Sequence, residues 1–381
     1  MSQERRIELI KKIEELHGSK VITYIVSDRP NIFTMIEEDD LRELYNHIKD
    51  IKQKGKIDLF IYSRGGVATV AWALANLLKE ASNEFDVMIP FNAFSCATSI
   101  AISANKIIMH KMGVLGPVDP SVANAFNPSN SNGVIPISVE DVSGFISFIN
   151  ENFGLKGNDK KVQIKKEETV LKIFEILAKQ LHPLAIGNVY RHYMKSRDDT
   201  KKLLELHLDP QKDKDKIERI IDILVEKLYY HGHHINREEA KEIGLNIVFP
   251  EKYNKKSDNL SDLMWKLYLE YENDLSLKIP YTDTLPDSGT KRELPLKFIE
   301  STTKSSQLVL EQEFVDLGYP KGSFLSEISQ PQSQYVIYVP GSPNPNPVPA
   351  FITPVVLDGK IYNKKETQIW KTQYINIREN Q

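Results

Sequence analysis

The sequence predicts an α/β fold built on a largely parallel β-sheet. Apolar strand-like segments alternate with helix-patterned segments over residues 20–109, as expected of successive strand–helix units. Two of the connections from strand to helix carry glycine or serine, "SRGGVA" at 63–68 and "FSCATS" at 94–99. The composition is globular, with 41% hydrophobic and 27% charged residues, and 381 residues are enough for two domains.

The elements of this core follow one another in a regular order. A charged N-terminal helix is expected within 1–20, because Ile7, Ile10, Ile13 and Leu16 fall on one stripe. The following segments are then a strand in 20–28, a loop and helix in 29–53, a strand, turn and helix in 56–81 and again in 84–104, and a strand with a Gly/Pro turn in 105–120.

The second half of the chain has a different pattern. Residues 139 to about 230 are charged and helical in pattern, with a solvated break at 209–216. Asn236 with Glu239 three residues later predicts a helix start, and Gly244 predicts its end. Beyond residue 280 the sequence indicates short strands and turns.

Composition and charge exclude several classes of function. The formal net charge of −3 provides no long-range attraction to nucleic acid. No run reaches the roughly 18 apolar residues of a membrane span, and the N-terminus lacks the apolar core of a secretory signal. A single cysteine excludes an internal disulfide and fits a reducing compartment, so a cytoplasmic location is expected.

The two turns carry the candidate chemistry. Gly65 and Gly66 stand between a strand and a helix, where free N–H groups at a helix start could form an oxyanion hole. Ser99 lies between the small residues Ala97 and Ala101, which would let the backbone turn sharply and expose its hydroxyl.

Structural explanations of these residues stay open at this point. The glycine pair could be only a tight turn, Ser99 could pack within a small-residue helix, and Cys96 could be a small buried packing residue or itself a nucleophile. No phosphate-loop pattern is present. A nucleophile elbow of the α/β-hydrolase type would need alanines in place of both of its glycines.

The order of these motifs resembles a known family. Segments "VAWALANLL", "FSCATSIAISANKIIMH", "LGPVDP" and "HHINREEAKEIGL" are similar to those of the serine dehydrogenase proteinases, Clp-fold serine proteinases related to signal peptide peptidase A within the ClpP/crotonase superfamily. The resemblance implies a ClpP/crotonase-like spiral of ββα units with a C-terminal α+β extension. It implies Ser99 as nucleophile, with the N–H groups of Gly65 or Gly66 and of Ile100 as oxyanion hole. The expected boundaries are a catalytic domain over 1–250, a helical connection over 251–280 and the extension over 281–381.

The catalytic base is less clear from the resemblance. Clp peptidases carry their histidine on the strand after the serine helix, where this chain reads "VLGPVDP" with Asp119 as its one ionisable group. The related Ser-Lys enzymes suggest a lysine between Lys156 and Lys166, but that stretch is highly charged. His182 has apolar neighbours and a suitable ordinary pKa. The prediction is therefore a Ser99–His182 pair with Asp119 orienting the imidazole, and the lysines and a solvent-assisted Asp119 are the alternatives.

The leading function is a serine peptidase that cleaves polypeptides. The alternatives are a crotonase-type enzyme acting on acyl-CoA thioesters and a catalytically silent interaction protein of the same fold. No cofactor is expected, and the histidines of "HGHH" at 231–234 are not expected to hold a metal because no carboxylate stands at ligand spacing. The expected partners are a polypeptide substrate and copies of the same chain in a homo-oligomer, without nucleic acid or an integral membrane segment, although membrane proximity stays open.

Overall fold

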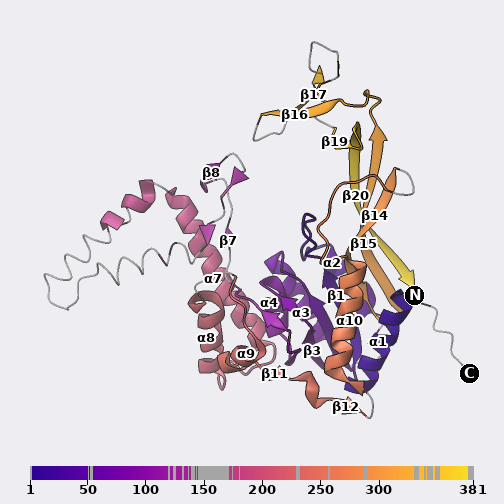
Figure 1. Cartoon of the computed structure of the whole chain (residues 1–381). Coiled ribbons are helices and arrows are strands. Elements are labelled where there is room, and N and C mark those ends of the chain that lie inside the picture. The colour runs from indigo at the N-terminus through magenta and orange to yellow at the C-terminus, as the bar shows by residue number, and fades with distance from the viewer. Residues whose placement is uncertain are drawn as a thin grey trace, which may run out of the picture.

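A computed structural model of the whole chain gives the architecture (Figure 1). It describes residues 2–49, 51, 55–118, 121–122, 126–130, 133–135, 137–138, 142, 144, 171–173, 175–179, 181–228, 232–255, 258–286, 290–329, 334–338, 340, 346–347 and 352–375. None of the helices within these ranges is long and apolar enough to cross a membrane.

A nine-stranded mixed sheet forms the centre of the molecule. Its parallel half runs in the order β11 (Ile247–Val248), β5 (Lys106–Met109), β3 (Glu84–Ile89), β2 (Lys56–Tyr62) and β1 (Lys20–Val26). Its antiparallel half continues with β14 (Lys291–Glu300), β15 (Lys304–Asp316), β20 (Lys360–Tyr374) and β19 (Pro354–Leu357). The strands predicted for the first 120 residues are thus confirmed as parallel neighbours.

Helices cover both faces of the parallel half. Helices α1 (Ser2–His17) and α10 (Leu260–Asp274) lie side by side against one face (Figure 1). The other face packs against α2 (Asp40–Ile48), α3 (Ala68–Ala81), α4 (Cys96–Ile102), α7 (Pro183–Glu205), α8 (Lys214–Asp222) and α9 (Arg237–Ile243). Strand β1 shows the reason, since Ile22 and Tyr24 point into one core while Val21 and Ile25 point into the other. Parallel strands that are buried on both faces read as continuous apolar runs, which is why the sequence signal was clear.

Helix α9 confirms the predicted start and stop signals. The side chain of Asn236 accepts hydrogen bonds from the N–H groups of Glu238 and Glu239. Gly244 ends the helix in the left-handed region at φ 118°. The predicted break at 209–216 also lies between the end of α7 and the first turn of α8.

Buried charges attach the C-terminal strands to the N-terminal core. Arg6 on α1 binds Glu300 at the end of β14, with Nε and Oε2 2.8 Å apart. Lys297 on β14 reaches Asp40 at the start of α2, with Nζ and Oδ1 2.9 Å apart. All four side chains are almost completely buried, so removing one partner would leave an uncompensated charge in the interior.

The architecture is a mixed α/β fold with a large, partly parallel sheet, consistent with the fold that the resemblance implies. The finer expectation of a spiral of ββα units stays a prediction, as do the domain boundaries at residues 250 and 280. Strands β14, β15, β20 and β19, all from the expected extension, nevertheless continue the sheet of the core.

Candidate active site

The two turns singled out in the sequence meet at the carboxyl edge of the parallel strands. Ser63, just after β2, forms a parallel bridge with Ala93 of the short strand β4 (Asn92–Ala93). The N–H of Ser63 donates to Asn92 O at 3.0 Å, and the N–H of Phe94 donates to Ser63 O at 3.0 Å. These bonds hold the glycine turn beside the serine turn. This edge is where open α/β sheets place their ligands.

Ser95 occupies a strained position at the start of α4. Its backbone has φ 50° and ψ −114°, a conformation that non-glycine residues rarely adopt. It is the N-cap residue of α4, yet its hydroxyl makes no capping hydrogen bond. The half-buried side chain lines a cavity of about 350 Å³. Strain of this kind persists where the surrounding structure holds it, and it is concentrated at functional sites.

The glycine pair lies directly against this serine. A Cβ atom on Gly65 would lie 2.9 Å from Ser95 Cβ and 2.9 Å from Phe94 O. A Cβ atom on Gly66 would lie 2.2 Å from Ile36 O. Side chains at either position would therefore push the two turns and the segment before α2 apart. Close approach of the backbone is the physical reason for glycine at both positions.

Two backbone N–H groups are free to face the cavity. The N–H of Gly65 already donates to Ser63 Oγ at 2.9 Å. The N–H of Gly66 has no acceptor among the described residues, and Gly66 itself lines the cavity. Cys96 is the first residue of α4, where helical N–H groups have no partner within the helix. Gly66 and Cys96 thus offer two backbone donors among the residues that line the cavity with Ser95.

A ladder of three chain segments brings a histidine to Phe94, the residue before Ser95. Strand β4 pairs in parallel with β6 (Val114–Leu115), and Leu115 forms an antiparallel bridge with Ile235. The next residues in this ladder are Phe94, Gly116 and His234. A Cβ atom on Gly116 would lie 3.0 Å from the Phe94 ring. Because Gly116 has no side chain, the exposed His234 ring stacks on Phe94, with centroids 5.1 Å apart and planes 16° apart.

Helix α7 forms the opposite wall of the cavity. His192, Lys195, Ser196 and Asp199 line it from this helix. Lys195 and Asp199 form an ion pair along the helix, and the Ser196 hydroxyl donates to Val118 O at 2.8 Å. The wall is therefore polar and charged, and its lysine is an exposed ammonium that is compensated by a carboxylate.

Comparison with known protein families identifies the first part of the chain. Residues 1–144 match the ClpP-like SDH-type serine proteinases. Over these residues the chain is similar to that family. The resemblance predicted from the sequence is thereby confirmed for the segment that holds the glycine turn, Ser95 and Ser99.

Two archaeal relatives extend the similarity. The Uncharacterized protein MJ0137 of Methanocaldococcus jannaschii is 28% identical over 248 residues, which cover 64% of this chain and 73% of the relative. The Uncharacterized protein MJ1495 of the same organism is 34% identical over 124 residues, which cover 31% of this chain and 42% of the relative. Neither name states an activity, so the peptidase function rests on the SDH-type proteinase family.

The structure separates the predicted catalytic pair. Ser99 lines the cavity, but His182 is outside it, at the N-terminal end of the long helix α7. Its Nδ1 accepts a hydrogen bond from the N–H of Leu184 at 3.2 Å, and its ring stacks on Phe126. His182 therefore serves as the N-cap of α7 and is not brought to Ser99. Asp119 and the segment from Lys156 to Lys166 lie outside the described residues.

The predicted oxyanion donor and the alternative nucleophile are also placed differently. Ile100 lies inside α4, where its N–H belongs to the bonding of the helix itself, and the N–H of Ser99 donates to Ser95 O at 2.9 Å. Burial raises the pKa of the Cys96 thiol to about 12, and its Sγ contacts Val67 O at 3.2 Å. Cys96 is therefore a packing residue, since a thiol must ionise to act as a nucleophile.

Sequence reasoning missed Ser95 and His234. Ser95 had a visible signal, because it directly follows the strand "NAF" and is the first hydroxyl of the turn, where a strained nucleophile stands. His234 had none within its own segment, since only the ladder through Gly116 brings it to the turn. Its neighbour His233 does contact a carboxylate, that of Glu239, with Nε2 and Oε1 2.8 Å apart.

Proposed function

We propose that this protein is a serine peptidase whose nucleophile is Ser95. The family of residues 1–144 supports peptidase activity at the level of the family. The observation that carries the assignment to Ser95 is its backbone of φ 50° and ψ −114° at a strand-to-helix turn, with an uncapped hydroxyl lining the cavity. Ser99, one helical turn later, stands in regular helix without this strained backbone.

The oxyanion hole is formed by the N–H groups of Gly66 and Cys96. Both belong to residues that line the cavity beside Ser95. Gly65 shapes this hole without donating to it, because its N–H is bonded to Ser63 Oγ. Fixed backbone donors of this kind stabilise the negative charge of a tetrahedral intermediate, and one of them contributes roughly 2.7 to 4 kcal/mol.

His234 is the general base. Clp peptidases take their histidine from the strand after the serine helix, and in this chain that stretch contains Gly116. His234 is the neighbour of Gly116 in the ladder, and its ring stacks on Phe94, the residue before Ser95. A neighbouring segment thereby supplies the imidazole that the strand itself lacks.

The reaction follows from these assignments. Ser95 Oγ attacks the carbonyl carbon of a peptide bond while His234 takes its proton, and the carbonyl oxygen becomes an oxyanion between the two N–H groups. The C–N bond breaks as the imidazolium returns the proton to the leaving amine, which leaves an acyl ester on Ser95. Water, deprotonated by His234, then hydrolyses this ester and regenerates the serine.

A crotonase-type enzyme and a catalytically silent protein would each behave differently from a serine peptidase. Enolate chemistry on acyl-CoA thioesters uses the same pair of donors but requires no strained serine. We expect the protein to hydrolyse casein or a fluorogenic peptide. We also expect a fluorophosphonate to abolish this hydrolysis. Turnover of an acyl-CoA that is unaffected by the fluorophosphonate, or no turnover with either substrate, would contradict the proposal.

Replacing His234 with alanine should reduce kcat/KM for a peptide substrate by about 10²-fold to 10⁴-fold, the usual contribution of a general base. The exposed ring contributes little to the core, so thermal stability should change by only a few degrees. His233→Ala is the matched control and should keep its activity, because that ring is engaged with Glu239. A loss of activity in Lys195→Ala with none in His234→Ala would assign the base to the lysine on α7.

We also propose that the protein forms a symmetric homo-oligomer, as expected for a relative of the Clp peptidases. Light scattering should give a mass that is a multiple of 43.6 kDa at micromolar concentrations. A monomer at all of these concentrations would contradict this expectation without affecting the assignment of Ser95.

A further inference from the structure

Two carboxylates lie next to each other in the interior, near the amino ends of the parallel strands. Asp58 on β2 and Asp86 on β3 are paired in register, and both side chains are completely buried. This position is near the opposite ends of the strands from those that lead to Ser95. Two adjacent buried carboxylates repel each other strongly unless a cation or a proton lies between them.

Three further groups surround this pair. His17, the last residue of α1, places Nδ1 2.6 Å from Asp58 Oδ2, and the Ser19 hydroxyl binds the same oxygen. Lys56 Nζ lies 2.7 Å from Asp86 Oδ2 and 3.2 Å from His17 Nε2. An ammonium group therefore stands between a carboxylate oxygen of Asp86 and an imidazole nitrogen of His17.

These groups leave part of the buried negative charge unsatisfied. The Oδ1 atoms of Asp58 and Asp86 are buried and have no hydrogen-bond partner among the described residues. The nearby Lys106 is paired with Glu84, with Nζ and Oε1 2.7 Å apart. Lys56 is thus the one lysine or arginine that pairs with either carboxylate in the described structure, beside the imidazole of His17. Buried polar atoms in this state call for an explanation such as a bound ion or water.

We propose that His17, Asp58 and Asp86 bind a divalent transition-metal ion of the zinc class. One ligand atom of each residue lies within 4.8 Å of the others. Tetrahedral zinc with bonds of about 2.1 Å separates its ligands by about 3.4 Å, so modest side-chain rotations would close the site. One imidazole and two carboxylates suit zinc better than magnesium or calcium, which prefer oxygen ligands alone.

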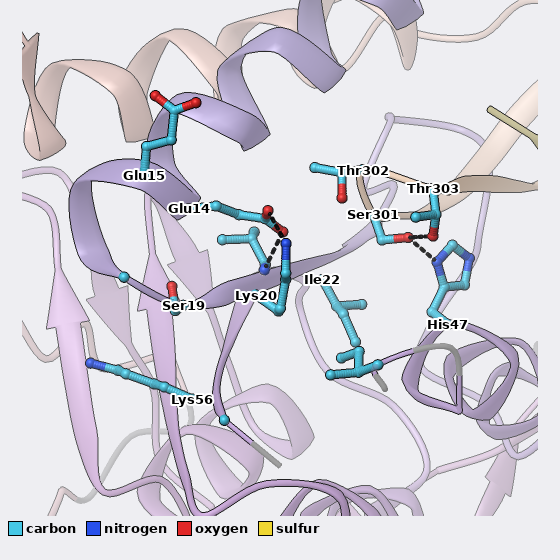
Figure 2. Close-up of a pocket in the computed structure, with 14 residues that line it drawn as sticks. Glu14, Glu15, Ser19, Lys20, Ile22, His47, Lys56, Ser301, Thr302 and Thr303 are labelled. Carbon is cyan, nitrogen blue, oxygen red and sulfur yellow. Dashed lines mark hydrogen bonds and ion pairs between the residues drawn. The ribbon is translucent and has the colours of Figure 1, made fainter. Parts of the chain in front are cut away.

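Lys56 acts as a competitor for this site. Its side chain is 19% exposed, and it lines a cavity of about 720 Å³ next to Gly18 and Ser19 (Figure 2). The ammonium can therefore turn into this cavity when the metal enters. The two carboxylates then neutralise the divalent charge. Without a metal ion, the buried carboxylates of Asp58 and Asp86 need another cation, and the ammonium of Lys56 supplies it.

The metal would join three separate elements of the fold. His17 belongs to α1, whereas the aspartates belong to β2 and β3. A cation bound by all three stabilises the folded state, because the ligands are far apart in the unfolded chain. The proposal is independent of the peptidase assignment, since Ser95 lies near the other ends of these strands.

The test is metal binding by the full-length protein after removal of bound metal with a chelator. Isothermal titration with Zn²⁺ should give one tight site per chain, and Co²⁺ should give the visible absorption of a low-symmetry complex. Asp86→Asn and His17→Ala should weaken binding about tenfold or more, as loss of a metal contact does. His233→Ala, in the "HGHH" segment, should leave this site unchanged.

Lys56→Met provides the result that impaired folding cannot imitate. Removing the competing ammonium should tighten Zn²⁺ binding about tenfold and increase the rise in melting temperature that Zn²⁺ causes. Absence of tight binding in the wild-type protein would overturn the proposal. It would equally be overturned if Asp58→Asn and Asp86→Asn bound Zn²⁺ as the wild type does, or if Lys56→Met did not bind it more tightly.

Discussion

Replacing Ser95 with alanine should lower kcat/KM for a peptide substrate by about 10⁴-fold or more, because loss of the nucleophile of a serine hydrolase reduces the rate by about 10⁴-fold to 10⁶-fold. The variant keeps the oxyanion donors and the cavity, so substrate should still bind. Ser95→Gly is a useful second variant, since glycine adopts the φ of 50° without strain. Both variants should be inactive while their unfolding transitions remain cooperative.

Ser99→Ala is the matched control for this prediction. Ser99 lines the same cavity from the same helix, only one turn away. Its kcat/KM should stay within a few-fold of the wild-type value, because its N–H already bonds Ser95 O and its hydroxyl has no role in the reaction. Retained activity in Ser95→Ala together with loss in Ser99→Ala would restore the nucleophile predicted from the sequence.

Gly66→Ala should damage both stability and activity. The new Cβ would lie 2.2 Å from Ile36 O and 2.5 Å from Ile36 N, at a residue with φ 155°. Overpacking and backbone strain each cost roughly 1 to 3 kcal/mol, so the free energy of unfolding should fall by roughly 2 to 6 kcal/mol. The same shift moves the N–H of Gly66 away from the oxyanion, which should lower kcat by about 10²-fold to 10³-fold.

Gly187→Ala separates this effect from a general effect of adding a methyl group. Gly187 lies within α7, and nothing comes within 4 Å of a Cβ atom built there. Alanine in a helix is favoured over glycine by about 1 kcal/mol, so this variant should be as stable as the wild type or more stable. Chemical denaturation and steady-state kinetics on both variants make the comparison. Equal stability and activity of Gly66→Ala and wild type would remove Gly66 from the proposed site.

The parallel core could be predicted because its signals are local. Continuous apolar strands, the glycine turn and the capping residue Asn236 each reflect physics that acts within a few residues. The site was harder, because Ser95 and Ser99 share the same helical segment. What distinguishes them is the residue at which the helix begins, and helix boundaries are uncertain by one or two residues even in structures.

His234 and His182 show the limits of local signals most clearly. The apolar neighbours of His182 suggested a buried imidazole, but the following proline begins helix α7 and makes the histidine its cap. His234 reaches Phe94 only because β4, β6 and Ile235 form a ladder with a glycine in its middle row. Pairings between such distant segments depend on the whole fold. The same is true of the ion pair between Arg6 and Glu300, which joins the C-terminal strands to the core.

The central claim is that Ser95 is the nucleophile, and the most direct measurement is to locate a covalent adduct on the native protein. The wild-type chain is labelled with a fluorophosphonate, digested, and analysed by tandem mass spectrometry of the peptide that contains both serines. The account predicts a single phosphonyl adduct on Ser95, which is lost in Ser95→Ala and kept in Ser99→Ala. An adduct on Ser99, or no adduct in a protein that hydrolyses peptides, would contradict it.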